Sequence, residues 1–180
     1  MKPLALITGV GPGTGASVAR RFAAAGYRTA LLARNEKRLN ALASELPDSK
    51  AIVCDVTDSE ALARAVEAAG PVDVVVHNAV GGGWGTFSEI EPEMLENNFQ
   101  VNVMALLHLA RLTTPSMVQA GKGALIVTGN TSALRGRAPF AGFAPTKAAQ
   151  RILAESMARE LGPKGVHIAY LVIDAVIDLA

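Results

Sequence analysis

The stretch LALITGVGPGTGASVARRFAAAG, residues 4–26, decides the fold of this 180-residue chain. Its first five residues are an apolar run that predicts a buried strand, and four glycines spaced by two follow. The apolar period then becomes helical, with Val18, Phe22 and Ala25 on one face. Glycines between a strand and a helix let a ligand approach the backbone closely. Because the N–H groups at a helix start attract anions, the stretch predicts a phosphate-binding turn.

Composition favours one domain, residues 1–180, with an aliphatic core. Half of the residues are hydrophobic but only 4% are aromatic, which suits a parallel sheet between helices. The net charge of +1 gives no electrostatic reason to expect nucleic acid or an anionic membrane as a partner. The single Cys54 excludes an intramolecular disulfide, and no stretch reaches the ~20 apolar residues of a membrane span. We therefore expect a soluble cytoplasmic protein, and no metal site.

The hydrophobic pattern alternates between strand and helix along the whole chain. Strands are expected at residues 4–8, 27–33, 50–54, 72–77, 123–128 and 166–173, with five helical patterns between them. The pattern that begins at Pro92 runs through Leu112 and contains a break. Alternation of this kind predicts an α/β fold, a doubly wound parallel sheet with strand order 3-2-1-4-5-6. Ligand is then expected at the carboxyl ends of the strands, between strands one and four.

The motif Thr8-Gly9-x-x-x-Gly13-x-Gly15 resembles the TGxxxGxG fingerprint of the short-chain dehydrogenases/reductases. The resemblance implies a Rossmann-like fold, a nicotinamide cofactor, and hydride transfer between that cofactor and a small carbonyl or alcohol. It also implies which residues of the turn bind the cofactor: Gly9, Gly11, Gly13, Thr14 and Gly15.

Arg34 is the residue that bears on cofactor preference. An NAD-preferring member of the family places an acid near the end of strand two, and Ala33-Arg34 leave no acid there. A guanidinium at this position can pair with a 2′-phosphate, so NADP(H) is expected and NAD(H) is less favoured. The alternative interpretation is a solvated arginine at a helix start.

Two further segments resemble parts of the family's cofactor site. Asp55 and Val56 resemble the pair beside adenine, although Asp55 could also merely end a strand. The run from His77 to Gly81 resembles the family's NNAG, which implies that Asn78 and Ala79 lie against the cofactor ribose. His77 replaces a non-catalytic asparagine and is expected to be structural.

The catalytic positions match the family only in part. Asn102 matches the asparagine that holds a water linked to the active-site lysine. Lys147 matches the lysine of YxxxK, which binds the nicotinamide ribose and lowers the pKa of the tyrosine. Phe143, however, stands where that motif has its tyrosine, and Phe140 stands where the enoyl-reductase variant has it. The usual proton donor is therefore missing.

The catalytic serine of the family aligns with Asn130, and Thr131 and Ser132 are near enough to substitute if the loop shifts. At the other end, the family commonly has Pro-Gly and a threonine where this chain has Asp174-Ala175 and Leu179. The last strand and the substrate-covering helices of the family lie beyond residue 180. The C-terminus is thus short for the family, and a truncated product or a fragment is one interpretation.

The leading hypothesis is an NADP(H)-binding oxidoreductase in which Lys147, Ser132 (or Thr131) and a water held by Asn102 transfer the proton. The alternatives are a cofactor-binding pseudoenzyme and a truncated, non-catalytic chain. Helical segments 102–112 and 146–161 carry apolar residues on more than one face, namely Met104, Leu106, Leu109, Ile152, Leu153 and Met157. Because a helix apolar around much of its girth is buried on two sides, we expect a homodimer or homotetramer.

Overall fold

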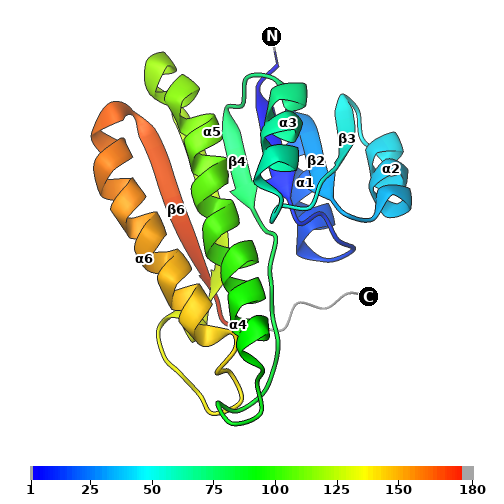
Figure 1. Ribbon diagram of the computed structural model, residues 1–180. Helices are drawn as coiled ribbons and strands as arrows, with labels where there is room; N and C mark the ends of the chain where they lie inside the picture. Colours follow the sequence, from blue (N-terminus) through cyan, green and yellow to red (C-terminus); the bar gives the residue numbers. More distant parts are fainter. Residues whose placement is uncertain (1, 176–180) are drawn as a thin grey trace.

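Six parallel strands form one sheet, and the computed structural model describes residues 2–175 of the chain. The strands are β1 (Leu4–Thr8), β2 (Arg28–Ala33), β3 (Ser49–Val53), β4 (Val74–His77), β5 (Gly123–Asn130) and β6 (Val166–Ile173). Their order is β3-β2-β1-β4-β5-β6, which confirms the predicted doubly wound topology (Figure 1). The helices are α1 (Thr14–Ala24), α2 (Glu36–Glu45), α3 (Ser59–Ala69), α4 (Pro92–Phe99), α5 (Ala105–Ala120) and α6 (Ala144–Leu161).

The helices pack on the two faces of the sheet in separate groups. On one face α3, α5 and α6 bury Leu62, Leu109 and Met157 against the sheet. On the other face α1 and α2 bury Ala19 and Leu39. The strands contribute alternate residues to the two clusters, which explains why the central strands read as continuous apolar runs.

The break predicted within the long helix after Pro92 is a π-helical turn. It covers Gln100–Met104, joins α4 to α5 and contains Asn102. Such turns inside α-helices are frequent at functional sites. The sequence predicted the interruption, but not its form.

Two strands differ from their expected limits by two residues, whereas the limits of β2 and β3 differ by one residue. β4 begins at Val74 rather than at residue 72. The side chain of Asp73, just before it, accepts a hydrogen bond from the N–H of Leu4 at 2.9 Å. β5 runs two residues further than expected, because its pairing with β6 continues to Asn130 opposite Ile173. Asn130 thus ends a strand instead of lying in a loop.

Candidate active site

A cavity of about 1270 Å³ lies at the carboxyl edge of the sheet. It is lined by the turn after β1, the ends of β2 and β3, and the loop after β4. All but one of the residues that the sequence assigned to cofactor binding line it: Gly9, Gly11, Gly13, Thr14, Gly15, Arg34, Asp55, Val56, Asn78 and Ala79. The exception is Lys147, which does not line this cavity.

The turn after β1 requires glycine at two of its positions. Gly9 has a φ of +67°, and a Cβ there would lie 2.4 Å from the backbone nitrogen of Ala79. A Cβ on Gly15 would lie 2.5 Å from the carbonyl oxygen of Gly9. In the described structure no side chain caps α1 at Gly13, so the first N–H groups of that helix are available to an anion in the cavity.

Hydrogen bonds connect the end of β1 to the end of β4 and to the loop that follows it. The Thr8 hydroxyl lies 3.1 Å from Nδ1 of His77 and accepts the N–H groups of Asn78 and Ala79, each at 3.3 Å. The Asn78 amide donates to the carbonyl of Gly9 at 2.8 Å. Burial, reinforced by the charge of Lys147, lowers the pKa of His77 to about 3. His77 is therefore a neutral ring inside the sheet and does not line the cavity.

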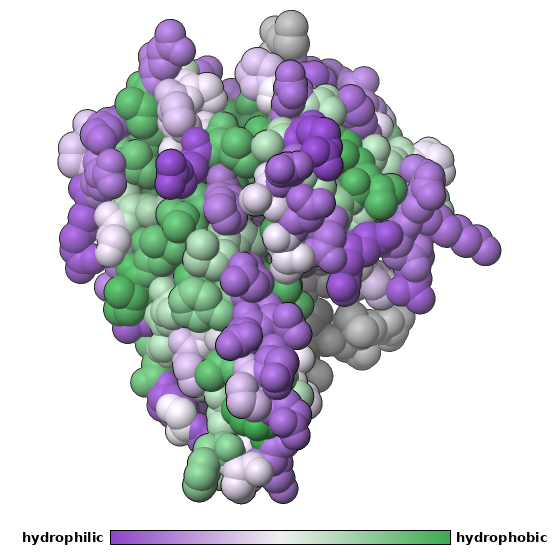
Figure 2. Space-filling view, in the orientation of Figure 1, coloured by the Kyte–Doolittle hydropathy of each residue, from purple (hydrophilic) through white to green (hydrophobic). Residues whose placement is uncertain are grey.

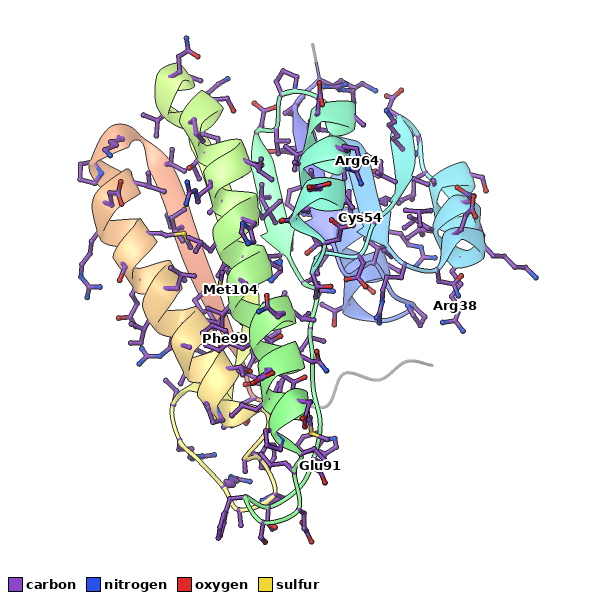
Figure 3. The ribbon with its side chains drawn as sticks, viewed as in Figure 1. Arg38, Cys54, Arg64, Glu91, Phe99 and Met104 are labelled. Carbon is purple, nitrogen blue, oxygen red and sulfur yellow. The ribbon has the colours of Figure 1, made fainter. Side chains whose placement is uncertain are left out.

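The edge of the cavity at β2 carries two arginines. Arg34 lies on the surface, with its guanidinium 4.0 Å from the carboxylate of Asp55. A hydrogen bond from the backbone of Thr57 holds the pKa of Asp55 below its usual value. Arg38, in the first turn of α2, lines the same cavity and was missed by the sequence analysis (Figure 3). The signal available in the sequence was a second arginine four residues after Arg34, close enough to contribute to the same phosphate site.

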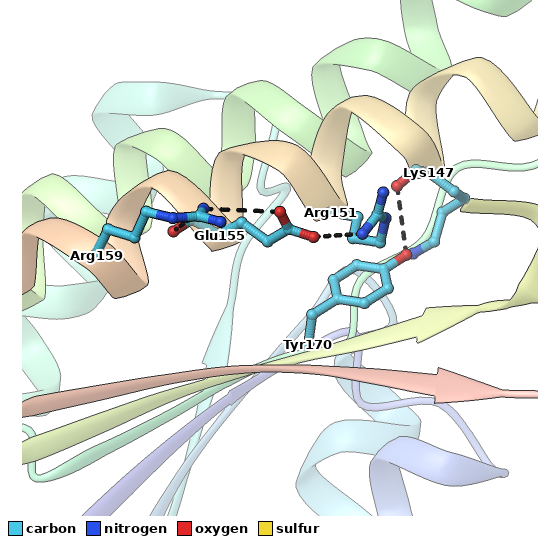
Figure 4. A network of polar contacts seen from close by, with 5 residues as sticks. All are labelled: Lys147, Arg151, Glu155, Arg159 and Tyr170. Atoms are coloured by element: carbon cyan, nitrogen blue, oxygen red, sulfur yellow. Dashed lines mark hydrogen bonds and ion pairs between the residues drawn. The ribbon is translucent and has the colours of Figure 1, made fainter. Parts of the chain in front are cut away.

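Lys147 is buried between α6 and the sheet, with 2% of its surface exposed. Its ammonium donates to the carbonyl of Thr128 at 3.0 Å and to the side-chain oxygen of Gln150. It lies 5.9 Å from the centre of the Tyr170 ring, whose hydroxyl donates to the backbone carbonyl of Lys147 at 3.3 Å (Figure 4). Burial lowers the pKa of Lys147 to about 8.

Asn102 connects the loop after β4 to α6. Its side-chain oxygen accepts the N–H of Gly81 at 3.0 Å, and its amide donates to Gly81 O at 2.9 Å and to the Thr146 hydroxyl at 2.8 Å. Its backbone carbonyl accepts the Gln150 amide at 2.6 Å. The side chain of Gln150 thus links Asn102 with Lys147, a role that the sequence analysis did not identify. Its spacing of three residues from Lys147 on one helix was the available signal.

Phe143 immediately precedes α6 and is 9% exposed. Its ring centre lies 6.2 Å from that of Trp84, and Trp84 in turn packs edge-on against Phe140 at 4.5 Å. The aromatic rings therefore form a wall at the position where the proton donor was expected.

The candidate substitutes for the serine form hydrogen bonds with residues other than Lys147. Ser132 lines a second, smaller hollow of about 340 Å³, together with Phe140 and Ala144. The Thr131 hydroxyl donates to the Asp174 carboxylate at 2.8 Å. Asn130 accepts the N–H of Ser132 at 3.1 Å. The structure thus links Lys147 and Asn102 through Gln150. Ser132 lines the smaller hollow, which neither Lys147 nor Asn102 lines.

A metal site and a membrane-spanning helix are both absent from the part of the chain that the structure describes. Within residues 2–175 there is no group of histidine, cysteine, aspartate or glutamate side chains able to hold a metal ion. None of the described helices is long and apolar enough to cross a membrane.

Comparison with known proteins gives matches over nearly the whole chain. The family model for short chain dehydrogenase matches residues 3–176. D-erythrulose reductase from Gallus gallus is 33% identical over 165 residues, which are 91% of this chain and 67% of that protein.

Two solved structures are also similar. A short-chain dehydrogenase from Streptomyces avermitilis has a TM-score of 0.91 at 30% identity, covering 96% of this chain and 65% of that one. A metagenomic short-chain oxidoreductase in complex with NADP has a TM-score of 0.89 at 29% identity, covering 97% and 83%. The chain spans about two thirds of the length of the Gallus and Streptomyces proteins.

Proposed function

Because this chain belongs to the short-chain dehydrogenase family, we propose that it binds NADP(H) and catalyses hydride transfer between that cofactor and a small carbonyl or alcohol. The observation that carries the proposal is the large cavity at the carboxyl edge of the sheet. Residues from five separate segments line it, and the family resemblance assigned residues in four of these segments to the cofactor. The similar metagenomic structure holds NADP.

The residues around the cavity fit a dinucleotide phosphate. The turn from Gly9 to Gly15 leaves no room for a Cβ at either end, and the uncapped start of α1 suits the pyrophosphate. Arg34 and Arg38 would pair with a 2′-phosphate at the opposite end of the cavity.

Other residues that line the same cavity would supply the remaining contacts with the cofactor. Asp55 and Val56 would flank adenine, while Asn78 and Ala79 would lie against the ribose. When bound, the cofactor supplies or accepts the hydride.

The proton must come from a group other than Phe143, whose ring has no hydrogen to donate. We assign this task to Lys147, which lies one helical turn further along α6 and whose backbone N–H bonds to the carbonyl of Phe143 at 3.2 Å. An ammonium with a pKa of about 8 is protonated at neutral pH and can release its proton near that pH. Its bonds to Thr128 and Gln150 fix its position without neutralising it, because both acceptors are uncharged.

The test is the consumption of NADPH in the presence of a panel of small carbonyl compounds. The panel begins with D-erythrulose, the substrate named for the Gallus relative. The proposal predicts carbonyl-dependent oxidation of NADPH that the Lys147→Met variant lacks. NADPH binding without oxidation by any carbonyl would contradict the proposed reaction and leave a cofactor-binding protein. Absence of binding would contradict the whole proposal.

A further inference from the structure

The side chain of Gln150 is fully buried between α6 and the π-helical turn. Its two polar ends have different partners. The amide nitrogen donates to the backbone carbonyl of Asn102 at 2.6 Å, and the amide oxygen accepts from the ammonium of Lys147. A side-chain amide in this orientation bridges the π-helical turn to the lysine directly.

The hydrogen bonds of the Lys147 ammonium can be counted. An ammonium has three N–H bonds. One goes to the carbonyl of Thr128 and one to Gln150, which leaves one for a ligand. Without Gln150, the carbonyl of Thr128 would be the one remaining acceptor of the Lys147 ammonium among the described residues. The direction of the other two N–H bonds would then no longer be fixed.

From this geometry we propose that Gln150 is a positioning residue, which anchors the Lys147 ammonium to the π-helical turn and so directs its remaining N–H bond, the source of the proton, toward the bound cofactor and carbonyl. This inference rests on the proposed function, because only that function places a cofactor and a carbonyl beside Lys147. Gln150 itself touches neither cofactor nor substrate in this account.

The other ionisable groups around Lys147 do not replace this anchor. His77 on β4 is neutral and buried, and the ring of Tyr170 on β6 lies beside the ammonium. Arg151 on α6 pairs with Glu155. In the described part of the chain no ion pair includes Lys147, so its position depends on the two uncharged oxygens.

The first test measures the titration of Lys147 by NMR in the cofactor-free protein, with [¹³C]lysine and with Lys147→Met to assign the resonance. Gln150→Glu keeps an acceptor for Lys147 but loses the donor to Asn102. The adjacent carboxylate should raise the pKa of Lys147 by about one unit or more. Gln150→Met removes both bonds and should lower this pKa.

The matched control is Thr113→Val. The buried Thr113 hydroxyl donates to the carbonyl of Leu109 within α5, so this variant also loses a buried hydrogen bond but not one to Lys147. It should leave the Lys147 titration unchanged. A purely structural role for Gln150 would lower the unfolding temperature of its variants without moving that titration.

The second test measures NADPH affinity against pH. Gln150→Met should weaken binding at neutral pH by about tenfold, since the ammonium is no longer held in position to donate to the cofactor and a hydrogen bond from a charged group is worth about that much. Gln150→Glu should move the alkaline loss of affinity to higher pH, and Thr113→Val should change neither.

The outcomes separate the two proposals. Unchanged Lys147 titration in both Gln150 variants would overturn the role of Gln150, whatever the cofactor does. Should the titration move while the wild-type protein binds no NADPH, the link between Gln150 and Lys147 stands and the proposed function falls. Gln150→Glu nearly preserves the shape of the side chain, so a folding failure of Gln150→Met would not leave the question open.

Discussion

At the scale of single residues, the main departure from the family pattern lies at the start of α6. Phe143 fills the place of the tyrosine, and its ring is part of an aromatic wall with Trp84 and Phe140. The motif spacing alone identified this substitution. It could not identify the wall, because Trp84 comes from a loop more than fifty residues earlier in the chain.

Restoring the phenol is a direct test of whether the pocket lacks only the proton donor that the family motif supplies. Phe143→Tyr should raise NADPH-dependent carbonyl reduction by at least about tenfold, because general acid catalysis typically contributes 10²–10⁴-fold. Lys147→Ala in the same background should remove the gain. Phe22→Tyr, which adds the same hydroxyl on α1 at a residue that does not line the cavity, is the control and should give no gain. An unchanged rate with unchanged NADPH affinity would show that substrate is not held within reach.

Arg34 carries the prediction on cofactor preference. Arg34→Ala should weaken NADPH binding by about tenfold or more and leave NADH binding unchanged, since a charge-assisted bond to the 2′-phosphate is lost. Calorimetric titration of both cofactors measures the difference. The control is Arg64→Ala, because Arg64 is an exposed arginine on α3 that does not line the cavity. Equal losses for NADPH and NADH would contradict the assignment.

At the scale of elements, the sequence predicted the existence and order of the strands and helices better than the local turns. The glycine turn was predictable because its spacing lies within one continuous stretch. The π-helical turn and the 3₁₀ turn Thr131–Ala133 were not, since both depend on contacts between distant segments.

The glycine turn gives a matched pair of substitutions. A Cβ on Gly15 would lie 2.5 Å from the Gly9 carbonyl oxygen and 2.8 Å from the Val10 Cα, both of them backbone atoms. A Cβ on Gly11 would meet nothing within 4 Å. Gly15→Ala should therefore lower the unfolding temperature by about 2–10 °C, as overpacking does, whereas Gly11→Ala should leave it unchanged. Thermal unfolding followed by circular dichroism measures both; equal effects would contradict the packing account of the turn.

At the scale of the whole molecule, the order of the strands could be predicted from the alternation of strand and helix. Which apolar residues lie on the surface could not. Leu106, Leu109 and Met157, expected to contribute to a second apolar face, lie in the core of the chain itself. The exposed large apolar residues of these helices are instead Leu112 on α5 and Ile152 on α6, and Phe99 at the end of α4 is also exposed. Figure 2 shows hydrophobic residues gathered on the side of the molecule formed by α5 and α6.

We propose that this side is covered by a second copy of the chain. Sedimentation velocity should show a dimer or tetramer at micromolar concentration, and Ile152→Glu should shift the protein toward monomer by placing a charge in the apolar contact. The control is Val53→Glu: Ile152 and Val53 are equally exposed, at 52%, but Val53 lies on β3 at the other edge of the sheet. A wild-type protein that remains monomeric throughout the concentration range would refute the proposed assembly.

The central claim is that the cavity holds NADP(H) for hydride transfer. The most direct measurement uses NADPH with deuterium at C4 of the nicotinamide, in each of its two epimers, and mass spectrometry of the alcohol formed from each carbonyl of the panel. The account predicts that one epimer delivers deuterium to the product, and that Lys147→Met greatly reduces the amount formed. If NADPH binds the protein but neither epimer delivers deuterium to any product, the account of this chain as an oxidoreductase is contradicted.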